Sequence, residues 1–329
     1  MGDAGILSLA AEILGNLKLS YPSQVPGMDS KIHYLAPHVP KAQWSALGDA
    51  ITAREQAFSG AIDGNEWISL RLDGTSFTQA VRMMRTKGIL EEGFSLVFAD
   101  CMVATLQTLM KRFDALVGYT QSDEMAIFIP PASIVRGVQQ AHAYNGRVTK
   151  LTTLAASFVT ASFLHGLATH CINKGLGIEA LGTVLPHFDC RLGHFASWNE
   201  ASSLLLWRAY DCSVNGVSDA VCHNTKSNST VRQQSTRDKL EWLHSHSKLP
   251  LPAHQAYGAL FVRTQRCVKG FDPKRGVETE AMRSVLEQIP GPVLETIRNG
   301  RLSLCLEDDK GTGAGRIKYV RVSTCTSTD

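Results

Sequence analysis

Hydrophobic residues in the middle of the chain follow two different periods. Trp67–Leu72 has the composition of a short strand, and it ends at Asp73 and a Gly-Thr-Ser turn. Farther on, apolar side chains recur every three or four residues, namely Phe94, Phe98, Cys101, Met102, Leu106, Leu109, Met110 and Phe113. This spacing predicts a helix whose broad apolar face packs in the core.

A β-hairpin is predicted next. The apolar runs Leu116–Thr120 and Met125–Ile129 flank the turn residues Gln121–Glu124, and Pro130-Pro131 stops the second strand. If the first strand pairs beside this hairpin, Asp73 and Asp123 lie at the same edge of one sheet. Three further elements are expected after the hairpin: a helix over 147–164, an irregular strand over 184–195 and a long helix over 197–223.

The long helix has a polar stripe. Arg208, Asp211 or Cys212, and Asn215 share one face at helical spacing, whereas Leu204, Leu205 and Trp207 cover other sides. Such a stripe faces either solvent or a polar cleft.

The two flanks of the chain have a different character. Residues 1–60 are predicted to be a helical extension, with helices over 7–17 and 42–58. Residues 61–225 form the expected catalytic domain. Residues 226–329 form a basic region that completes the fold, with a polar loop over 224–237 leading into it and a poorly ordered tail from Lys310.

Composition sets limits on the class of protein. With 329 residues, 44% hydrophobic and 19% charged, the chain is long enough for one large domain with additions, or for two domains. The apolar stretches predict no membrane span, and the N-terminus has no pattern of a secretory signal or transit peptide. Eight cysteines without a C-x-x-C pair are typical of a reducing compartment, and Cys222, His223, His244 and His246 fit no strong zinc template.

The charge is mildly basic and uneven. A net charge of +3 and a pI near 8.4 permit nucleic-acid binding without requiring it. Basic residues cluster after residue 226, and the cationic positions predicted to contact RNA phosphates are Arg208, Arg263, Arg266 and Lys269. The alternative for these clusters is an ordinary solvated surface.

Two short acidic motifs carry the clearest chemistry. They are Arg71-Leu72-Asp73-Gly74 and Gln121-Ser122-Asp123-Glu124, and their aspartates stand fifty residues apart. Two carboxylates on neighbouring strand ends can bind a pair of divalent cations, which can align a nucleoside triphosphate for attack at its α-phosphorus. The alternative for Asp73-Gly74 is a simple turn.

Five motifs in order resemble the tRNA-histidine guanylyltransferase family, over about residues 55–266. The first two are the acidic motifs above. The others are Tyr144-x-x-Arg147-x-x-Lys150, Phe188-Asp189-x-Arg191, and Leu206-Trp207-Arg208-x-x-Asp211-Cys212-x-x-Asn215. The segment Tyr257-Gly258-x-Leu260-Phe261-Val262-Arg263 matches the last part of the family pattern.

The resemblance implies an α+β fold with a polymerase-like palm, which is a ferredoxin-like βαββαβ core with an antiparallel sheet. It implies an enzyme that adds nucleotides to a tRNA 5′ end in the 3′→5′ direction, with two Mg²⁺ ions and with ATP and GTP as substrates. Asp73, Gly74 and Asp123 would hold the metals, and Glu124 would be either a third acidic group or a solvent-facing residue. The nucleotide would also contact Thr75, Ser76, Phe77, Ser122, Arg147, Lys150 and Asn215; the alternative for Arg147 and Lys150 is an exposed helix start.

Departures from the family pattern favour its guanylyltransferase-like branch, which repairs tRNA 5′ ends. Ser213 and Gly216 stand where the family has a histidine and a second asparagine, Gly146 replaces an arginine, and Thr75-Ser76 replaces Arg-Gly. Three alternatives stay open: addition of one guanylate to intact tRNA-His, a nucleotide cyclase, and a non-catalytic tRNA-binding paralogue. The resemblance also implies a dimer or tetramer. We expect no membrane partner, and we expect the protein to act in the cytoplasm or the mitochondrion.

Overall fold

The computed structural model describes residues 60–182, 184–291, 302–309 and 314–322, together with Asp49 and Thr296. The chain divides into two compact units, Met1–Ala61 and Ile62–Asp329. The helices predicted over 7–17 and 42–58 lie outside the described residues, apart from the helical residue Asp49. Everything below concerns the second unit.

The strands and helices predicted between residues 67 and 223 are present, and further short elements lie between them. Its helices and strands are β1 Trp67–Thr75, α3 Phe77–Thr86, α4 Leu96–Arg112, β2 Val117–Gln121, β3 Glu124–Ile129, β4 Ile134–Val135, β5 Val138–Gln139, η1 Ala143–Gly146, α5 Val148–Asn173, η2 Ile178–Leu181, β6 His187–Phe195 and α6 Trp198–Asn224. The elements that follow are η3 Thr230–Gln233, α7 Thr236–Ser245, α8 Ala253–Tyr257, β7 Ala259–Asp272, β8 Val277–Ile289, β9 Leu302–Asp309 and β10 Ala314–Val322.

A six-stranded sheet forms the centre of the unit, in the order β6-β1-β3-β2-β7-β8. All of its neighbouring strands pair antiparallel. The first four strands, with α3–α4 and α5 as the crossovers, make the predicted βαββαβ core. The fold prediction is therefore confirmed, and β7 and β8 extend the sheet at the β2 edge.

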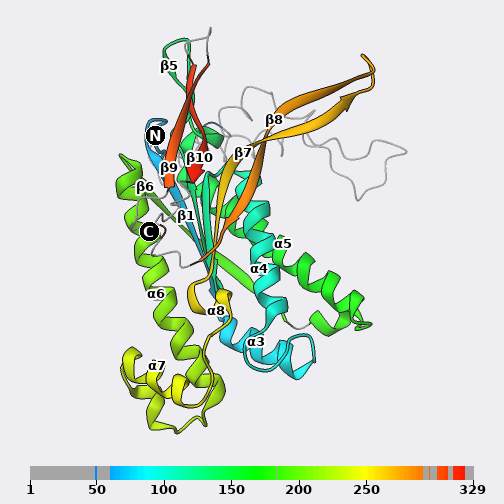
Figure 1. The fold of residues 1–329 in the computed structure, drawn as a ribbon, viewed down its shortest axis with the longest axis vertical. Coiled ribbons are helices and arrows are strands. Elements are labelled where there is room, and N and C mark those ends of the chain that lie inside the picture. The colour runs from blue at the N-terminus through cyan, green and yellow to red at the C-terminus, as the bar shows by residue number, and fades with distance from the viewer. Residues whose placement is uncertain are drawn as a thin grey trace, which may run out of the picture. The chain divides into compact units, whose positions relative to one another are not determined.

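Helices cover both faces of the sheet. Alternation along β1 sends Leu70 and Leu72 to the core beneath α4 and α5, while Trp67 joins the core beneath α6. Figure 1 shows α4 and α5 on one side of the strands and α6 on the other. Side chains that leave β1 on the α6 side, such as Asp73, are thus separated from the main aromatic core.

The start of α6 explains why its boundaries could be predicted. Ser197 Oγ accepts from the backbone N–H of Glu200 at 3.3 Å, and the Glu200 carboxylate accepts from the N–H of Ala196 at 3.0 Å. Such reciprocal capping satisfies N–H groups that have no partner within the helix.

Helix α5 departs from one expectation. Its length and composition alone would let it cross a membrane, although the sequence predicts no such segment. Every fourth residue of its inner face, however, packs in the core: Leu151, Ala155, Val159, Phe163, Leu167 and Cys171 are all buried. The high apolar content therefore reflects packing against the sheet, and the absence of a membrane partner stays a prediction.

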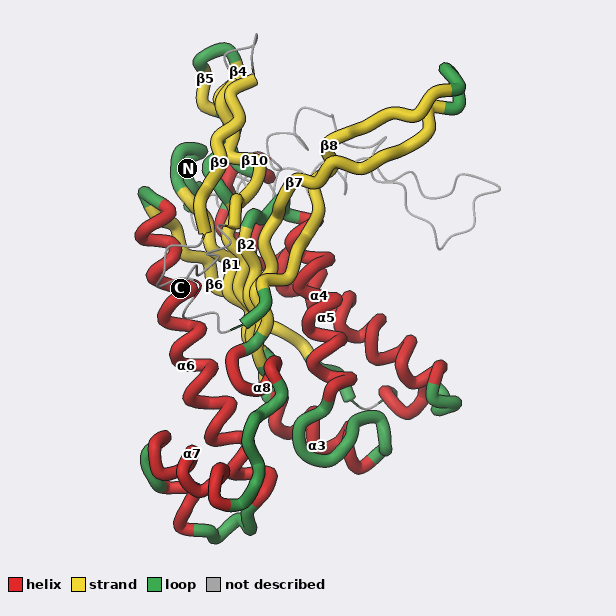
Figure 2. Tube along the Cα trace, viewed as in Figure 1, coloured by secondary structure: helices red, strands yellow, loops and turns green. Residues whose placement is uncertain are grey.

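The C-terminal part differs from the expected layout. The predicted disordered tail contains strand β10, which pairs antiparallel with β9. Figure 2 shows β7 and β8 continuing past the other strands as a two-stranded ribbon. Strands β7 and β8 belong to the same sheet as β1–β3, whereas β9 and β10 form a two-stranded sheet of their own. The three-part domain division stays a prediction.

Candidate nucleotide and metal site

The two acidic motifs meet at one edge of the sheet. Asp73 on β1 lies opposite Glu124 at the start of β3. The backbone N–H of Gly74 donates to the carbonyl oxygen of Asp123 at 3.1 Å. The predicted adjacency of Asp73 and Asp123 is therefore confirmed, because β1 does pair beside the hairpin.

Ser122 and Asp123 make up the two-residue hairpin turn. Ser122 has φ 51°, in the left-handed region that non-glycine residues seldom adopt, and its hydroxyl donates to Asp123 Oδ1 at 3.1 Å. Strained backbone of this kind is common at functional sites. The turn holds the Asp123 carboxylate in a fixed position beside β1.

The electrostatics of the pair suit a cation. Burial raises the pKa of Asp123, and the nearby charge of Asp73 raises it further. Within the described part of the chain, Asp73 makes no hydrogen bond or ion pair. The guanidinium of Arg71 compensates part of the charge of Asp73, and a cation bound between the two carboxylates would stabilise them further.

Magnesium fits these donors. Asp73, Asp123 and the carbonyl oxygen of Gly74 are hard oxygen ligands, which Mg²⁺ prefers. Among the described residues, no group of three or more histidine, cysteine or acidic side chains could hold a metal by itself. Any Mg²⁺ held by these oxygen atoms would have to complete its coordination with water or with nucleotide phosphates.

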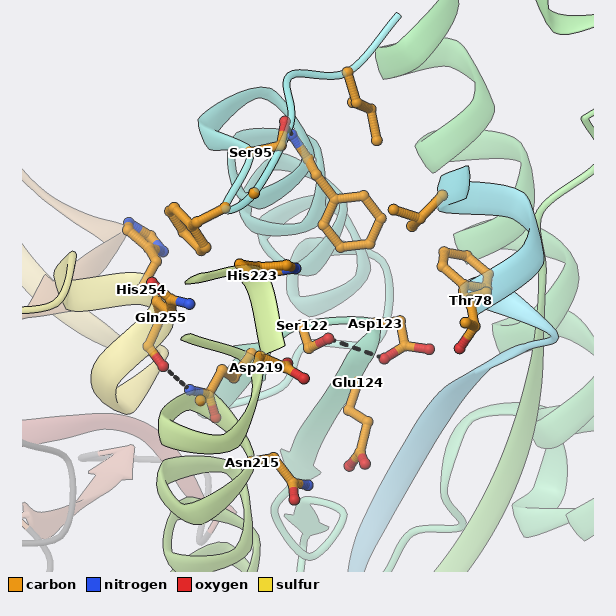
Figure 3. Close-up of a pocket in the computed structure, with 18 of the residues that line it drawn as sticks. Thr78, Ser95, Ser122, Asp123, Glu124, Asn215, Asp219, His223, His254 and Gln255 are labelled. Carbon is orange, nitrogen blue, oxygen red and sulfur yellow. Dashed lines mark hydrogen bonds between the residues drawn. The ribbon is translucent and has the colours of Figure 1, made fainter. Parts of the chain in front are cut away.

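A cavity of about 400 Å³ opens next to the turn. Ser122, Asp123 and Glu124 line one part of it, and α3, the loop before α4, α6 and α8 supply the rest. Figure 3 shows Asn215, Asp219 and His223 facing this space across from Thr78, with Asp123 between them. The volume falls in the usual range for a small-molecule site.

Glu124 is not a free acidic group. Its carboxylate pairs with the guanidinium of Arg208, which also donates to Asp211 Oδ2 at 3.1 Å. The arginine is buried, with 4% of its surface exposed. Arg208 therefore positions Glu124 from α6, and its burial leaves the RNA contact predicted for Arg208 without structural support.

Helix α6 separates two hollows, which changes the interpretation of Ser213 and Gly216. Asn215 lines the cavity beside Asp123, whereas Ser213 lines a different hollow between α6, α7 and α8. A Cβ on Gly216 would lie 1.9 Å from the carbonyl oxygen of Gln255. The glycine is thus required by the close approach of α8, and Ser213 is outside the cavity.

The departure at Gly146 also has a structural reason. Gly146 has φ +67°, and a Cβ there would lie 2.3 Å from the carbonyl oxygen of Ile62. No arginine could replace it without moving the chain. Thr75 and Ser76 are exposed at the start of α3, and Ser76 has φ 57°.

Phe77 is first of all a core residue. It packs against Phe98, Phe163 and Phe188, with ring centroids 6.1, 5.7 and 4.8 Å away. It also lines the cavity, so its predicted contact with a nucleotide stays a prediction.

Arg147 and Lys150 are not brought to the cavity. They are exposed at the start of α5, where Gly146 accepts from the N–H of Ile62 at 3.0 Å, ahead of β1. Gly74 pairs with Phe188 on β6, and the N–H of Phe188 donates to the Thr160 hydroxyl on α5 at 3.2 Å. The part of α5 that lies beside Gly74 is therefore near Thr160. Lys150 therefore lies about 15 Å back along the helix.

The basic positions on β7 have different roles. Arg263 donates to the carbonyl oxygens of Met110 and Ala115 at 2.8 and 3.0 Å, so it holds the end of α4. Arg266 pairs with Glu287 at 2.9 Å, and Lys269 pairs with Glu280 at 3.8 Å, both on the exposed ribbon. The two ribbon residues remain candidates for RNA contact, whereas Arg263 has a structural role.

Among the lining residues that the sequence analysis missed, four carry ionisable side chains: Arg85, Asp219, His223 and His254. A signal for two of them was present, since Asn215, Asp219 and His223 recur at four-residue spacing on α6. Burial raises the pKa of Asp219. Burial, and then the charge of Arg85, lower the pKa of His223.

A ferredoxin-like sheet with two aspartates at adjoining strand ends and a cavity beside them defines a palm domain of the nucleotidyltransferase type. Comparison with known proteins identifies a related family. Residues 52–196 match the family model for Thg1, tRNAHis guanylyltransferase. Residues 52–196 of this chain are therefore similar to the domain that defines the Thg1 family, a family of nucleotidyltransferases.

Two relatives are similar to the chain in sequence. The uncharacterized protein R259 of Acanthamoeba polyphaga mimivirus is 25% identical over 253 residues, which cover 72% of this chain and 83% of that protein. The tRNA(His) guanylyltransferase of Neurospora crassa is 27% identical over 154 residues, which cover 46% of this chain and 47% of that enzyme.

Solved structures show the same fold. A bacterial tRNA(His) guanylyltransferase (Thg1)-like protein in complex with ATP is 21% identical, with a TM-score of 0.54 and coverage of 73% of this chain and 91% of that one. A structure of such a protein with GTP is 22% identical, with a TM-score of 0.53 and coverage of 78% and 96%. At these identities the likeness concerns the fold.

Proposed function

We propose that the protein is a cation-dependent nucleotidyltransferase that extends the 5′ end of a tRNA in the 3′→5′ direction. The observation that supports this most directly is the placement of Asp73 beside the Ser122–Asp123 turn, next to a cavity of about 400 Å³. The similarity to the Thg1 family supports the same reaction class.

In this proposal each residue has a defined task. Asp73, Asp123 and the carbonyl oxygen of Gly74 hold Mg²⁺, which supplies positive charge to bind the triphosphate and to stabilise negative charge that develops in the reaction. Ser122 offers a hydroxyl donor to a phosphate oxygen. Arg208 keeps Glu124 oriented toward the cavity through their ion pair.

The reaction has two displacements at phosphorus. An oxygen of the tRNA 5′-monophosphate attacks the α-phosphorus of ATP or GTP, and pyrophosphate leaves. The 3′-hydroxyl of an incoming nucleotide then attacks the activated 5′-phosphate, and a nucleoside monophosphate leaves. Both steps need the attacking and leaving oxygens to be held in line, which is a matter of positioning and electrostatics.

Within this reaction we propose template-directed repair of truncated tRNAs. The proposal rests on the sequence pattern at Ser213 and Gly216, where the family's histidine and second asparagine are missing. In the structure, Ser213 lines the neighbouring hollow and Gly216 packs against α8. The two departures therefore affect the packing of α6 against α7 and α8 more directly than they affect the proposed cation site at Asp73 and Asp123.

The test uses a 5′-monophosphorylated tRNA without its first nucleotide, together with ATP, Mg²⁺ and labelled GTP. We expect incorporation of label at the 5′ end, and a loss of about a hundredfold or more in Asp73→Asn and in Asp123→Asn. Asp100→Asn, an exposed carboxylate on α4, is the matched control and should keep full activity. Normal turnover in either site variant would refute the palm assignment.

The same assay separates the alternatives. If kcat/KM for the truncated tRNA is well below kcat/KM for intact tRNA-His, single guanylate addition is favoured over repair. Binding of tRNA without incorporation would indicate a non-catalytic paralogue, and a cyclic nucleotide formed without RNA would indicate a cyclase. We further propose a dimer or tetramer that acts in the cytoplasm or the mitochondrion.

A further inference from the structure

The cavity has two chemically different ends. Ser122 and Asp123 form the end where the cation and phosphates would lie. The same cavity is also lined by apolar side chains, namely Val81, Leu90, Phe94 and Phe98. Apolar and aromatic surface of this kind suits the flat face of a nucleobase.

Across from this apolar wall, α6 presents Asp219. Figure 3 shows Asp219 on the same helix face as Asn215 and His223. Within the described residues, the Asp219 carboxylate makes no hydrogen bond or ion pair. It is exposed to solvent, and its charged neighbours are His223, Arg85 and Asp123.

Arg85 is held in place on the other side of the cavity. Its guanidinium donates to the carbonyl oxygen of Gly93 at 2.5 Å and to that of Glu91 at 3.2 Å. These bonds orient the group toward the loop before α4. Asp219 therefore keeps its full capacity to accept hydrogen bonds, even though a cation lies near it.

A second acceptor in the cavity lining is also without a donor. Gln121 is 94% buried, and its Nε2 donates to the carbonyl oxygen of Gln255 at 2.6 Å. That bond fixes the orientation of the amide, because a carbonyl oxygen can only accept. Gln121 Oε1 is then left without a partner among the described residues. Unpaired buried acceptors are uncommon and indicate a missing donor.

We propose that Asp219 selects guanine by accepting hydrogen bonds from the N1–H and the 2-amino group of a guanine nucleotide whose base lies against Phe94 and Phe98. The inference rests on the proposed function, since it places the phosphates of the same nucleotide at the Ser122–Asp123 end. Guanine presents two adjacent donors on one edge, and a single carboxylate accepts both.

Adenine fits this arrangement badly. At the matching position it presents the lone pair of N1, which a carboxylate repels, and it offers only one amino donor. Discrimination by a bidentate contact of this kind amounts to about tenfold to a hundredfold in affinity. Removal of the negative charge should therefore change the choice of base more than the affinity for the triphosphate.

Equilibrium binding without RNA tests the inference, measured calorimetrically in Mg²⁺ with GTP, ATP and ITP. ITP keeps N1–H but has no 2-amino group. We expect the wild-type protein to bind GTP at least about tenfold more tightly than ATP or ITP. In Asp219→Asn this preference should fall to within about threefold, with the affinity for ATP nearly unchanged. Asp100→Asn is the control and should keep the wild-type ratios.

The outcomes separate the inference from the function on which it rests. If the wild-type protein binds nucleotides without a preference for GTP, the role of Asp219 is overturned. The same holds if Asp219→Asn keeps the wild-type preference. In both cases the transferase proposal is unaffected. If no nucleotide binds to the wild-type protein, both proposals fail. Asp219→Ala provides the same comparison if the Asn variant does not fold.

Discussion

Gly216 allows a quantitative test of how α6 and α8 pack beside the cavity. In Gly216→Ala the added methyl group would lie 1.9 Å from the carbonyl oxygen of Gln255 and 3.0 Å from Nε2 of Gln121. The first contact is with backbone, so α8 has to move. That movement also stretches the 2.6 Å bond between the two glutamines.

Three effects set the expected magnitude. Alanine in a helix interior is more stable than glycine by about 1 kcal/mol. Overpacking costs about 1–3 kcal/mol. Loss of the buried hydrogen bond costs about 1 kcal/mol more. We therefore expect Gly216→Ala to lower the free energy of unfolding by about 1–3 kcal/mol.

Gly166→Ala in α5 is the matched control. Its methyl group would lie 3.2 Å from Cys101 Sγ, the end of a side chain that can shift by a few tenths of an ångström. The gain in helix stability should then be at least as large as the steric cost. This variant should be as stable as the wild type or up to about 1 kcal/mol more stable. The assay is urea unfolding followed by circular dichroism. A Gly216→Ala variant as stable as Gly166→Ala would refute the close approach of α6 and α8.

Two further predictions concern buried polar groups. Arg208→Met should lower the free energy of unfolding by about 2 kcal/mol, which is less than for a fully buried pair because Glu124 and Asp211 are 23% and 43% exposed. Adding Glu124→Gln to this variant should recover part of the loss, because it removes the unpaired charge. An Arg208→Met variant as stable as the wild type in urea unfolding would contradict the ion pair. His142 is buried, its Nε2–H donates to the carbonyl oxygen of Glu66 at 2.9 Å, and burial lowers its pKa although Glu66 and Asp63 favour the charged form. The unfolded chain therefore binds the extra proton first as the pH falls below about 6.5, so stability should drop on acidification from there, and His142→Gln should flatten the dependence of the urea midpoint on pH between 8 and 5.

The regular elements and the meeting of the acidic motifs followed from local patterns. The periods in β1, β3 and α4 are strong, and a hairpin beside β1 leaves few alternatives for where Asp73 and Asp123 can lie. The environment of Arg208 could not be predicted in this way, because a polar stripe on a helix does not show which strand it faces. Its partner Glu124 is far away in sequence.

The motif that contains Arg147 and Lys150 does not show where these residues lie relative to the cavity. They follow the hairpin closely along the chain, yet β3 runs antiparallel to β1 and delivers the chain to the opposite end of the sheet. Ser213 illustrates a finer limit, since it is two residues from Asn215 and faces a different hollow. Successive residues on a helix point in directions about 100° apart, so a motif does not ensure a shared site.

The position of β7 in the sheet affects how the protein is made. Val117 on β2 pairs with Val262 on β7, so the edge of β2 stays open on the ribosome until nearly the whole sheet-forming region has been synthesised. Until then the nascent chain exposes unpaired backbone groups beside buried residues such as Tyr119. A truncated product that ends before β7 would keep this open edge and be prone to aggregation.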